Sequence, residues 1–377
     1  MKHELVHEKK QKEPLFHIVK RDAVKASTPY IVRAVAIAVA LLVCSVVTVI
    51  FTGQNPFGLF GAMFKASFGS FSRILTMLSN LAILLCISLA VTPAFKMRFW
   101  NIGAEGQVLA GGLAVAACMI CLGDLPPVIL IPLMLVVSML AGALWAFLPA
   151  ICKAVWGTNE TLFTLMMNYV AIQLVRFFVT VWENPKGSGH IGVIRKGKLP
   201  ELFGTEEILP ILVVAAVTGL MYMYLKYSKH GYEIEVVGQS ENTARYIGIN
   251  VKKVIVRTML VSGAVCGIAG LLLVSGTDQT ISPDTAGGDG FTAIMVSWLA
   301  KFNPLYMVLT AFLIVFLSRG GGEIATSFDL NPSFPEILTG IILFFIIGCE
   351  FFIRYSVRFR HKRDELLAED ERKETVA

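Results

Sequence analysis

Charged residues are scarce in this sequence of 377 residues. Asp, Glu, Lys and Arg together make up 16% of it, whereas hydrophobic residues make up 55%, and the mean hydropathy is +0.68. A soluble domain of this size exposes far more charge. The composition therefore excludes an ordinary soluble globular protein and indicates a polytopic membrane protein.

Histidine and cysteine are placed too sparsely for a catalytic or metal site. Cys118 and Cys121 have a C-x-x-C spacing, but no second pair and no histidine cluster accompanies them. The cysteines lie in or at the ends of apolar runs, where we expect them to pack as small hydrophobic residues. No nucleophile, base and acid come together, because all six histidines fall in expected loops or tails: His3, His7, His17, His190, His230 and His361. We therefore expect neither a catalytic site nor a bound metal.

Long apolar runs fill most of the chain. A membrane-spanning helix needs about 20 apolar residues. Runs of this kind predict an all-α polytopic membrane bundle of about ten spans, at 29–51, 71–92, 104–123, 127–152, 160–182, 207–226, 254–276, 290–301, 303–318 and 335–353. The run at 290–301 is too short to cross alone. Asn303-Pro304 is a candidate interruption of a helix rather than a loop.

Basic residues gather on one predicted side of the membrane. Lys and Arg number seven within residues 1–28, six within 226–257 and seven within 354–377, which is 20 of the 33 in the chain. Ten spans place these segments on the same side, which the positive-inside rule assigns to the cytoplasm. The formal charge of +6 is thus explained by membrane orientation and attraction to anionic lipid, and we expect no binding of nucleic acid.

These features divide the chain into three parts. Residues 1–28 form a basic cytoplasmic arm, which we expect to be retained because the first apolar run is a full span without a cleavage site. Residues 29–353 form the transmembrane domain, with a cytoplasmic loop at about 227–253 and an external loop at about 183–207. Residues 354–377 form a charged cytoplasmic tail. Both termini are therefore expected on the cytoplasmic side of the plasma (inner) membrane.

A polar segment precedes the third expected span. It contains Asn101, Glu105 and Gln107, with glycines at 103 and 106. An ionisable side chain at membrane depth costs about 2.5–3.5 kcal/mol on insertion scales, so it normally faces a bundle interior or a watery path. The three polar residues are therefore candidates to line a path for a polar solute. The alternative is that they only join helices through hydrogen bonds, each contributing roughly 0.6 kcal/mol.

Polar residues also open the fifth expected span. Glu160 and Asn168 are eight residues apart, close to two helical turns, so they can share one face. Together with Asn159 they are further candidates to line the path. Thr158 or Asn159 is equally suited to cap a helix that starts in a cytoplasmic loop. Both interpretations stay open.

A faint internal repeat aligns the first five spans with the last five. The third and eighth spans each follow a break with glycines and a carboxylate, at 101–107 and at 287–290. Because five is odd, such repeats are inverted in the membrane, as in transporters built around a central site. Asp289 is therefore another path candidate. Chance similarity is the alternative.

The expected cytoplasmic loop contains a short polar segment with residues that favour the start and the end of a helix. Ser240 can cap a helix, Glu241 suits its positive end, and Gly248 can stop it after about two turns. The segment, which includes Arg245 and Tyr246, is either a docking helix for a cytoplasmic partner or a solvated loop.

Two further motifs need no ligand. Gly263, Gly267 and Gly270 form a small-residue helix face that allows close packing of transmembrane helices. The stretch 192–199 has the spacing of a phosphate-binding loop, but Leu199 replaces the Ser or Thr that holds magnesium and no strand precedes it. We therefore expect no nucleotide site in this chain.

Taken together, these motifs resemble the permease subunits of bacterial ABC importers for simple sugars and nucleosides. The resemblance covers most of the chain from residue 70 onward. Its most specific element is F-N-I-G-A-E-G-Q, which this chain matches at Phe99–Gln107 with Trp100 inserted before Asn101. The chain departs from the family at Thr292, where Asp is usual, and at Leu299-Ala300, where Leu-Gly is frequent. Further matches lie at Asn159–Asn168, Ala244–Ile249, Ser262–Gly270 and Gly290–Ile294.

The resemblance implies a set of partners. It implies a second permease subunit of different sequence, a cytoplasmic ATP-binding cassette ATPase that uses ATP and magnesium, and an extracellular substrate-binding lipoprotein. Membrane lipid is the remaining partner, because it surrounds the permease. The permease itself would bind no cofactor and would not be an enzyme. The segment with Ser240, Glu241, Arg245, Tyr246 and Gly248 would couple it to the ATPase.

The resemblance favours nucleosides as the solute, because the full N-I-G-A-E-G-Q element is typical of nucleoside-type importers. A simple sugar of the ribose or galactose class is the alternative. A different class of function is a secondary carrier driven by sodium or protons, in which Glu105, Glu160 or Asp289 would be the coupling carboxylate.

Overall fold

The computed structural model describes residues 16–21, 28–53, 55–331 and 333–359. The chain divides into two compact units. Unit 1 comprises residues 1–59 and 328–377, and unit 2 comprises residues 60–327. Each unit is considered by itself.

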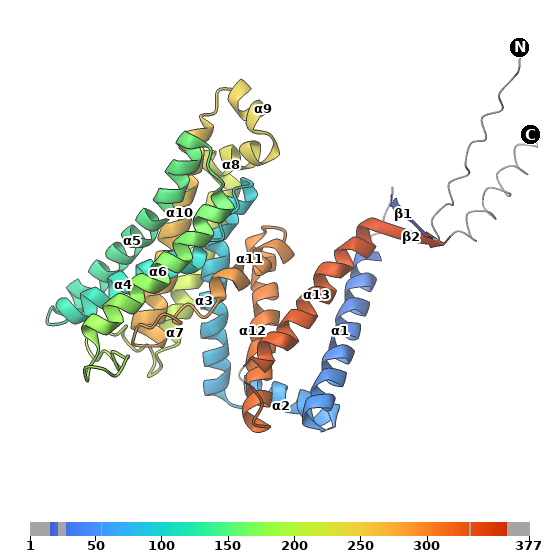
Figure 1. Ribbon diagram of the computed structural model, residues 1–377, viewed down its shortest axis with the longest axis horizontal. Helices are drawn as coiled ribbons and strands as arrows, with labels where there is room; N and C mark the ends of the chain where they lie inside the picture. The colour runs from blue at the N-terminus through green and yellow to red at the C-terminus, as the bar shows by residue number, and fades with distance from the viewer. Residues whose placement is uncertain (1–15, 22–27, 54, 332, 360–377) are drawn as a thin grey trace, which may run out of the picture. The chain divides into compact units, whose positions relative to one another are not determined.

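Helices make up nearly all the regular structure in the described part of the chain (Figure 1). This confirms the all-α class. In chain order the elements are β1 (Phe16–Lys20), α1 (Thr28–Thr52), α2 (Pro56–Phe68), α3 (Phe71–Lys96), α4 (Ala104–Cys121), α5 (Pro127–Trp156), α6 (Glu160–Trp182), α7 (Ile208–Tyr227), α8 (Lys229–Gln239), α9 (Glu241–Tyr246), α10 (Val251–Leu271), the π-helix η1 (Leu272–Thr277), α11 (Asp289–Leu299), α12 (Pro304–Ser327), α13 (Phe334–Arg354) and β2 (Tyr355–Phe359).

Nine helices in the described residues are long and apolar enough to cross a membrane. They coincide with nine of the ten expected spans, and η1 extends α10 to complete the seventh. The eighth expected span is α11, which has only 11 residues. At 1.5 Å per residue it is about 16 Å long, roughly half of a bilayer's hydrocarbon core.

Unit 1 brings its two chain segments together at one end. Strand β1 pairs antiparallel with β2, with Phe16 opposite Phe359 and Lys20 opposite Tyr355. Since β1 precedes α1 and β2 follows α13, the start of α1 and the end of α13 lie at the same end of this unit. The sequence analysis predicted only charged segments here and missed the strands. The rest of the expected arm and tail, residues 1–15, 22–27 and 360–377, falls outside the described residues.

Helix α10 is the central helix of unit 2 and packs against α3, α4 and α5 (Figure 1). Its small residues permit this contact. A Cβ at Gly263 would overlap the carbonyl of Gly142 on α5, and one at Gly267 would overlap the carbonyl of Ser138. Gly270 lies equally close to the backbone of Val108 on α4. These contacts confirm the packing role predicted for the glycine face.

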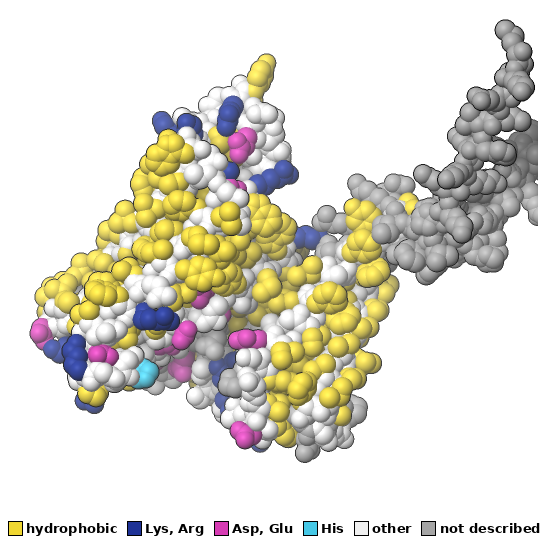
Figure 2. All heavy atoms as spheres, in the orientation of Figure 1, with side chains coloured by type: hydrophobic (Ala, Val, Ile, Leu, Met, Phe, Trp, Pro, Cys, Tyr) yellow, Lys and Arg dark blue, Asp and Glu magenta, His cyan; other side chains and the backbone are white. Residues whose placement is uncertain are grey.

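The two ends of unit 2 differ. At one end, here called the α9 end, α8 and α9 join α7 to α10. At the opposite end, the loop 183–207 contacts the end of α10, where the Leu199 amide donates to the Ser275 carbonyl (3.1 Å). On the face shown in Figure 2, hydrophobic side chains cover the region between the two ends, and charged side chains gather at each end. This distribution matches a protein surrounded by lipid.

Helix α11 and the non-helical segment that precedes it together make one crossing of unit 2. Residues 278–288 leave the opposite end after η1 and reach the start of α4, where α11 begins. At its other end α11 lies beside the last turns of α3, since the Ser297 hydroxyl lies 2.9 Å from that of Thr92. The prediction that Asn303-Pro304 interrupts a helix is wrong, because residues 300–303 connect two helices that fold back on each other, with the Thr310 hydroxyl of α12 donating to the Val296 carbonyl of α11 (3.4 Å). The break lies at 278–288 instead.

Helix α2 was not predicted. It is a 13-residue apolar helix between α1 and α3. Within unit 2, Phe64 and Phe68 of α2 pack against Phe316 of α12, with ring centroids 6.3 and 6.1 Å apart. The run was too short to count as a span, and its apolar residues show no marked helical periodicity.

The close approach of α10 to α5 yields a test of the fold. We expect Gly267→Ala to push the helices apart and to destabilise the protein by about 1–3 kcal/mol, the usual cost of overpacking. The measurement is the thermal unfolding midpoint of the detergent-purified chain. Gly219→Ala is the control, because a Cβ at Gly219 meets nothing within 4 Å. An equal midpoint for both variants would contradict the close packing.

Candidate functional site

Two helices begin next to each other inside unit 2, and a carboxylate joins them. Both oxygens of Glu105, in the first turn of α4, accept backbone hydrogen bonds from the start of α11: Oε1 from the Gly288 amide and Oε2 from the Gly290 amide, each at 2.9 Å. Gly288 has φ of +80°, which favours glycine. A Cβ at Gly290 would overlap the Glu105 backbone. Helix starts carry partial positive charge, so the carboxylate is favourably placed.

Asn101 stabilises the turn that leads into α4. It is fully buried, and its Oδ1 accepts hydrogen bonds from the Gly103 amide and from Gln107 Nε2, both at 3.1 Å. Its Nδ2 donates to the hydroxyl of Ser262 on α10 (3.2 Å). The side chain thus joins the turn, α4 and α10.

Asn168 joins the same turn to α6. Its Oδ1 accepts from the Gly106 amide (2.9 Å), and its Nδ2 donates to the Ile102 carbonyl (2.9 Å). The Ile102 amide donates to the hydroxyl of Thr164, one turn earlier on α6 (3.1 Å). These bonds satisfy backbone groups that the break leaves without helical partners, as burial in a membrane requires.

The cluster lies well inside the bundle. Asn168 is the ninth residue of α6 and Ser262 the twelfth of α10, and both helices start at the α9 end. At 1.5 Å per residue the cluster is roughly 12–17 Å from that end, near the middle of a bilayer. The breaks predicted before the third and eighth spans therefore meet at the centre. The division into inverted repeats stays a prediction.

A few polar atoms at the cluster have no hydrogen-bond partner among the described residues. They are Gln107 Oε1 and Trp145 Nε1, both buried. Trp145 is close to Asn168, because a Cβ at Gly106 would lie 3.0 Å from both Trp145 Nε1 and Asn168 Oδ1. Buried unpaired polar atoms of this kind are suited to pairing with a polar solute or water.

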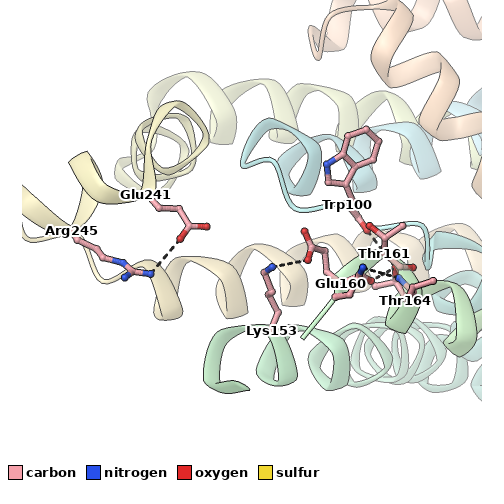
Figure 3. A network of polar contacts seen from close by, with 9 residues as sticks. Trp100, Lys153, Glu160, Thr161, Thr164, Glu241 and Arg245 are labelled. Atoms are coloured by element: carbon pink, nitrogen blue, oxygen red, sulfur yellow. Dashed lines mark hydrogen bonds and ion pairs between the residues drawn. The ribbon is translucent and has the colours of Figure 1, made fainter. Parts of the chain in front are cut away.

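The remaining path candidates are more dispersed. Asn159 is exposed at the α9 end and caps α6, its Oδ1 accepting from the Leu162 amide (3.2 Å). Glu160 forms an ion pair with Lys153 of α5 (2.7 Å; Figure 3). Neither side chain joins the central cluster. Asp289 is the first residue of α11 and lies between the two glycines that bind Glu105.

Figure 3 shows how Thr164 connects these regions. Its hydroxyl lies within hydrogen-bond distance of the carbonyls of Glu160 (2.7 Å), Thr161 (3.2 Å) and Trp100 (3.4 Å). Thr164, Ser262 and Trp145 were missed by the sequence analysis. Thr164 lies one turn before Asn168 on the same helix face, which was a usable signal. Nothing in the sequence pairs Trp145 or Ser262 with the break at 101–107.

The predicted docking segment forms helix α9 with its expected ends. Ser240 caps it by accepting from the Thr243 amide (3.2 Å), and Gly248 follows its end with φ of +84°. Glu241 and Arg245 form an ion pair one turn apart (3.3 Å; Figure 3). Tyr246 is 93% exposed. A short capped helix that presents an exposed tyrosine is suited to contact with a partner.

Trp100 and Thr292, which depart from the family pattern, make contacts with residues close by in the structure. The inserted Trp100 is 46% exposed, and its ring lies 5.5 Å from that of Trp298. The Thr292 hydroxyl donates back to the Gly288 carbonyl (3.3 Å). In the described residues no group of His, Cys, Asp and Glu side chains is arranged to hold a metal ion.

The Glu105 carboxylate can be tested directly. Glu105→Gln leaves one acceptor oxygen and turns an NH₂ group toward a backbone N–H. We expect the loss of a charge-assisted hydrogen bond to destabilise the protein by about 1.5–3 kcal/mol, seen as a lower thermal midpoint in detergent. Glu201→Gln, at an exposed position of the loop 183–207, is the matched control. Unchanged stability of the Glu105 variant would show that the carboxylate does not hold α11.

The chain is similar to several transport permease proteins. The chain is 28% identical over 336 residues to a glucose ABC transporter permease protein, TsgB13, of Haloferax volcanii, covering 84% of this chain and 87% of that one. It is 27% identical over 330 residues to a nucleoside ABC transporter permease protein, NupB, of Lactococcus lactis (84% and 90% covered). It is 28% identical over 343 residues to a guanosine ABC transporter permease protein, NupP, of Bacillus subtilis (89% and 97% covered).

A second permease protein from each of the two latter strains also matches, at 24% and 23% identity. No solved structure matches the chain. The family model described as branched-chain amino acid transport system / permease component matches residues 73–347, which include every helix from α4 to α12 and the central cluster. The chain therefore belongs to this family of membrane transport permeases.

Proposed function

We propose that the chain is the permease subunit of an ATP-driven importer and that it carries nucleosides. The observation that carries the choice of solute is the similarity to two permease proteins named for nucleosides and guanosine, over 84% and 89% of this chain. The relative named for glucose supports a simple sugar as the alternative. Nucleosides and sugars share a hydroxyl-rich ring, so one polar site suits either class.

The central cluster supports a path at this place. Asn101, Glu105, Gln107, Asn168 and Asp289 provide amides and carboxylates where two helix starts meet near mid-membrane. In inverted-repeat transporters, helix starts and unwound backbone at the midplane bind polar solutes. Because Asn101, Glu105 and Asn168 are bonded within the protein, they position the backbone of the path. Gln107 and Asp289 are the side chains with hydrogen-bonding capacity to spare.

The chain would work with separate subunits. We infer a cytoplasmic ATPase that binds and hydrolyses ATP with magnesium, an extracellular substrate-binding lipoprotein, and a second permease subunit. The matching second permease proteins in two bacterial strains support a partner of different sequence. The basic residues at the α9 end support a cytoplasmic position for that end. We infer from the same excess of Lys and Arg in the terminal segments that both termini are cytoplasmic and that the loop 183–207 is outside.

The contrasting proposal, an ion-coupled carrier, is less well supported. Its candidate carboxylates Glu105 and Glu160 are engaged by backbone amides and by Lys153, respectively. This leaves Asp289, for which the described residues provide no ion pair. All three relatives reported above are named as ABC transporter permeases.

The energy source and the solute can be tested together. Cells that carry the complete importer are expected to take up radiolabelled guanosine when the proton gradient is collapsed and ATP is maintained, and to lose uptake when the ATPase gene is deleted. Excess unlabelled nucleoside should compete and excess hexose should not. Competition by hexose alone would assign the importer to sugars. Uptake that follows the proton gradient without the ATPase would instead make the chain a secondary carrier.

Coupling through α9 can be tested with two variants. We expect Tyr246→Ala and Arg245→Glu to abolish solute-stimulated ATP hydrolysis and to weaken ATPase binding at least ten-fold, the usual scale for losing an interface anchor. Tyr246 is nearly fully exposed, so its truncation should leave the thermal midpoint unchanged. The control is Lys229→Glu, the same charge reversal at an exposed position of α8. Normal solute-stimulated ATP hydrolysis in both α9 variants would contradict docking and favour the alternative of a solvated segment.

A further inference from the structure

A basic cavity of about 340 Å³ opens at the α9 end of unit 2, away from the central cluster. Among the described residues its wall includes Lys96 of α3, Lys226 of α7, Lys301 of the connection between α11 and α12, and one carboxylate, Glu235 of α8. Tyr222 and Phe302 line it as well. Its position, charge and surroundings each point to the same kind of ligand.

The cavity lies at the level where membrane spans end. Lys96 is the last residue of α3, Lys226 is the penultimate residue of α7, and Pro304 is the first of α12. These three helices are all long enough to cross the bilayer. The cavity is therefore level with the lipid headgroups of one leaflet.

The charge of the cavity is positive. Among the described lining residues there are three lysines and one glutamate, and Lys96 pairs with Glu235 (3.0 Å). Lys226 Nζ donates to the Tyr222 hydroxyl (2.9 Å) and lies over the Tyr222 ring, 5.2 Å from its centroid. Neither contact neutralises the Lys226 charge.

The backbone adds to the positive charge. Helix α12 starts in the wall of the cavity, and a helix start attracts anions. The preceding residues Lys301 and Phe302 have φ of +52° and +60°. Two successive non-glycine residues in the left-handed region are uncommon and fix the direction of this connection.

An exposed aromatic surface adjoins the cavity. The Phe302 ring, part of the cavity wall, lies 5.5 Å from the Trp298 ring, which lies 5.5 Å from the Trp100 ring. Trp100 and Trp298 are 46% and 47% exposed. Tryptophan is enriched at the membrane interface, where its ring contacts the upper part of lipid chains.

We propose that this cavity binds an anionic phospholipid, with the phosphate among Lys96, Lys226 and Lys301 and the acyl chains along Trp298 and Trp100. A soluble phosphate would match the lysines but would make no use of the aromatic surface. A plain aromatic belt would need neither the cavity nor its three lysines. Basic pockets between helix ends at a membrane surface are suited to anionic headgroups. The inference does not depend on the solute that the permease carries.

The test is lipid retention by the full chain, purified with its partner subunits. Phosphatidylglycerol is titrated into the detergent-solubilised complex, and bound lipid is counted by native mass spectrometry. Since each lysine near a membrane surface contributes about 1 kcal/mol, we expect Lys226→Gln to weaken binding about five-fold and Lys226→Gln with Lys301→Gln about 25-fold. Glu235→Gln removes the one acidic group among the described lining residues and should strengthen binding.

Two controls make the result decisive. Lys229→Gln removes the same charge three residues away, outside the cavity lining, and should leave binding unchanged. Phosphatidylcholine should bind weakly to all variants, and inorganic phosphate should not displace the lipid at millimolar concentration. Equal loss in the Lys226 and Lys229 variants, or unchanged binding in the double variant, would overturn the proposal. Displacement by inorganic phosphate would make the cavity a soluble-anion site and overturn it as well.

Discussion

Backbone amides inside a bilayer need partners, and the pairing of Glu105 with Gly288 and Gly290 meets this need where two helices begin at mid-depth. Each helix start leaves N–H groups without helical partners. Here the Glu105 carboxylate accepts from two amides at the start of α11. Asn101 and Asn168 accept from the amides of Gly103 and Gly106, at the start of α4. Gly290 follows from the same requirement, because a Cβ there would overlap the Glu105 backbone, whereas Gly288 is explained by its positive φ.

The meeting of the two helix starts also explains why the path candidates have two kinds of environment. Side chains that hold the breaks, such as Asn101 and Asn168, have their polar atoms occupied within the protein. Gln107 keeps a buried oxygen without a partner in the described part of the chain. The hypotheses of helix contact and of a solute path therefore apply to different residues of one cluster, rather than competing for all of them.

The sequence was sufficient for the features that depend on local chemistry. Apolar runs predicted the long helices, Ser240 predicted the start of α9, and glycine spacing predicted the packing of α10. It was insufficient where distant segments meet. No pattern indicates that Glu105 contacts Gly288, or that Thr164 and Ser262 complete the turn, because these contacts depend on tertiary packing. Helix α2 and the β1–β2 pair were missed because short elements carry too little periodicity.

Helix α11 is bonded to α4 through the Glu105 carboxylate at its start, and a non-helical segment precedes it. The rest of α11 packs against α3 and α12. A movement that separated the two helix starts would break two charge-assisted hydrogen bonds, about 3–6 kcal/mol in total. At equilibrium a state with the two helix starts apart would hold less than about one per cent of the molecules, unless contacts made only in that state compensate for the two lost bonds.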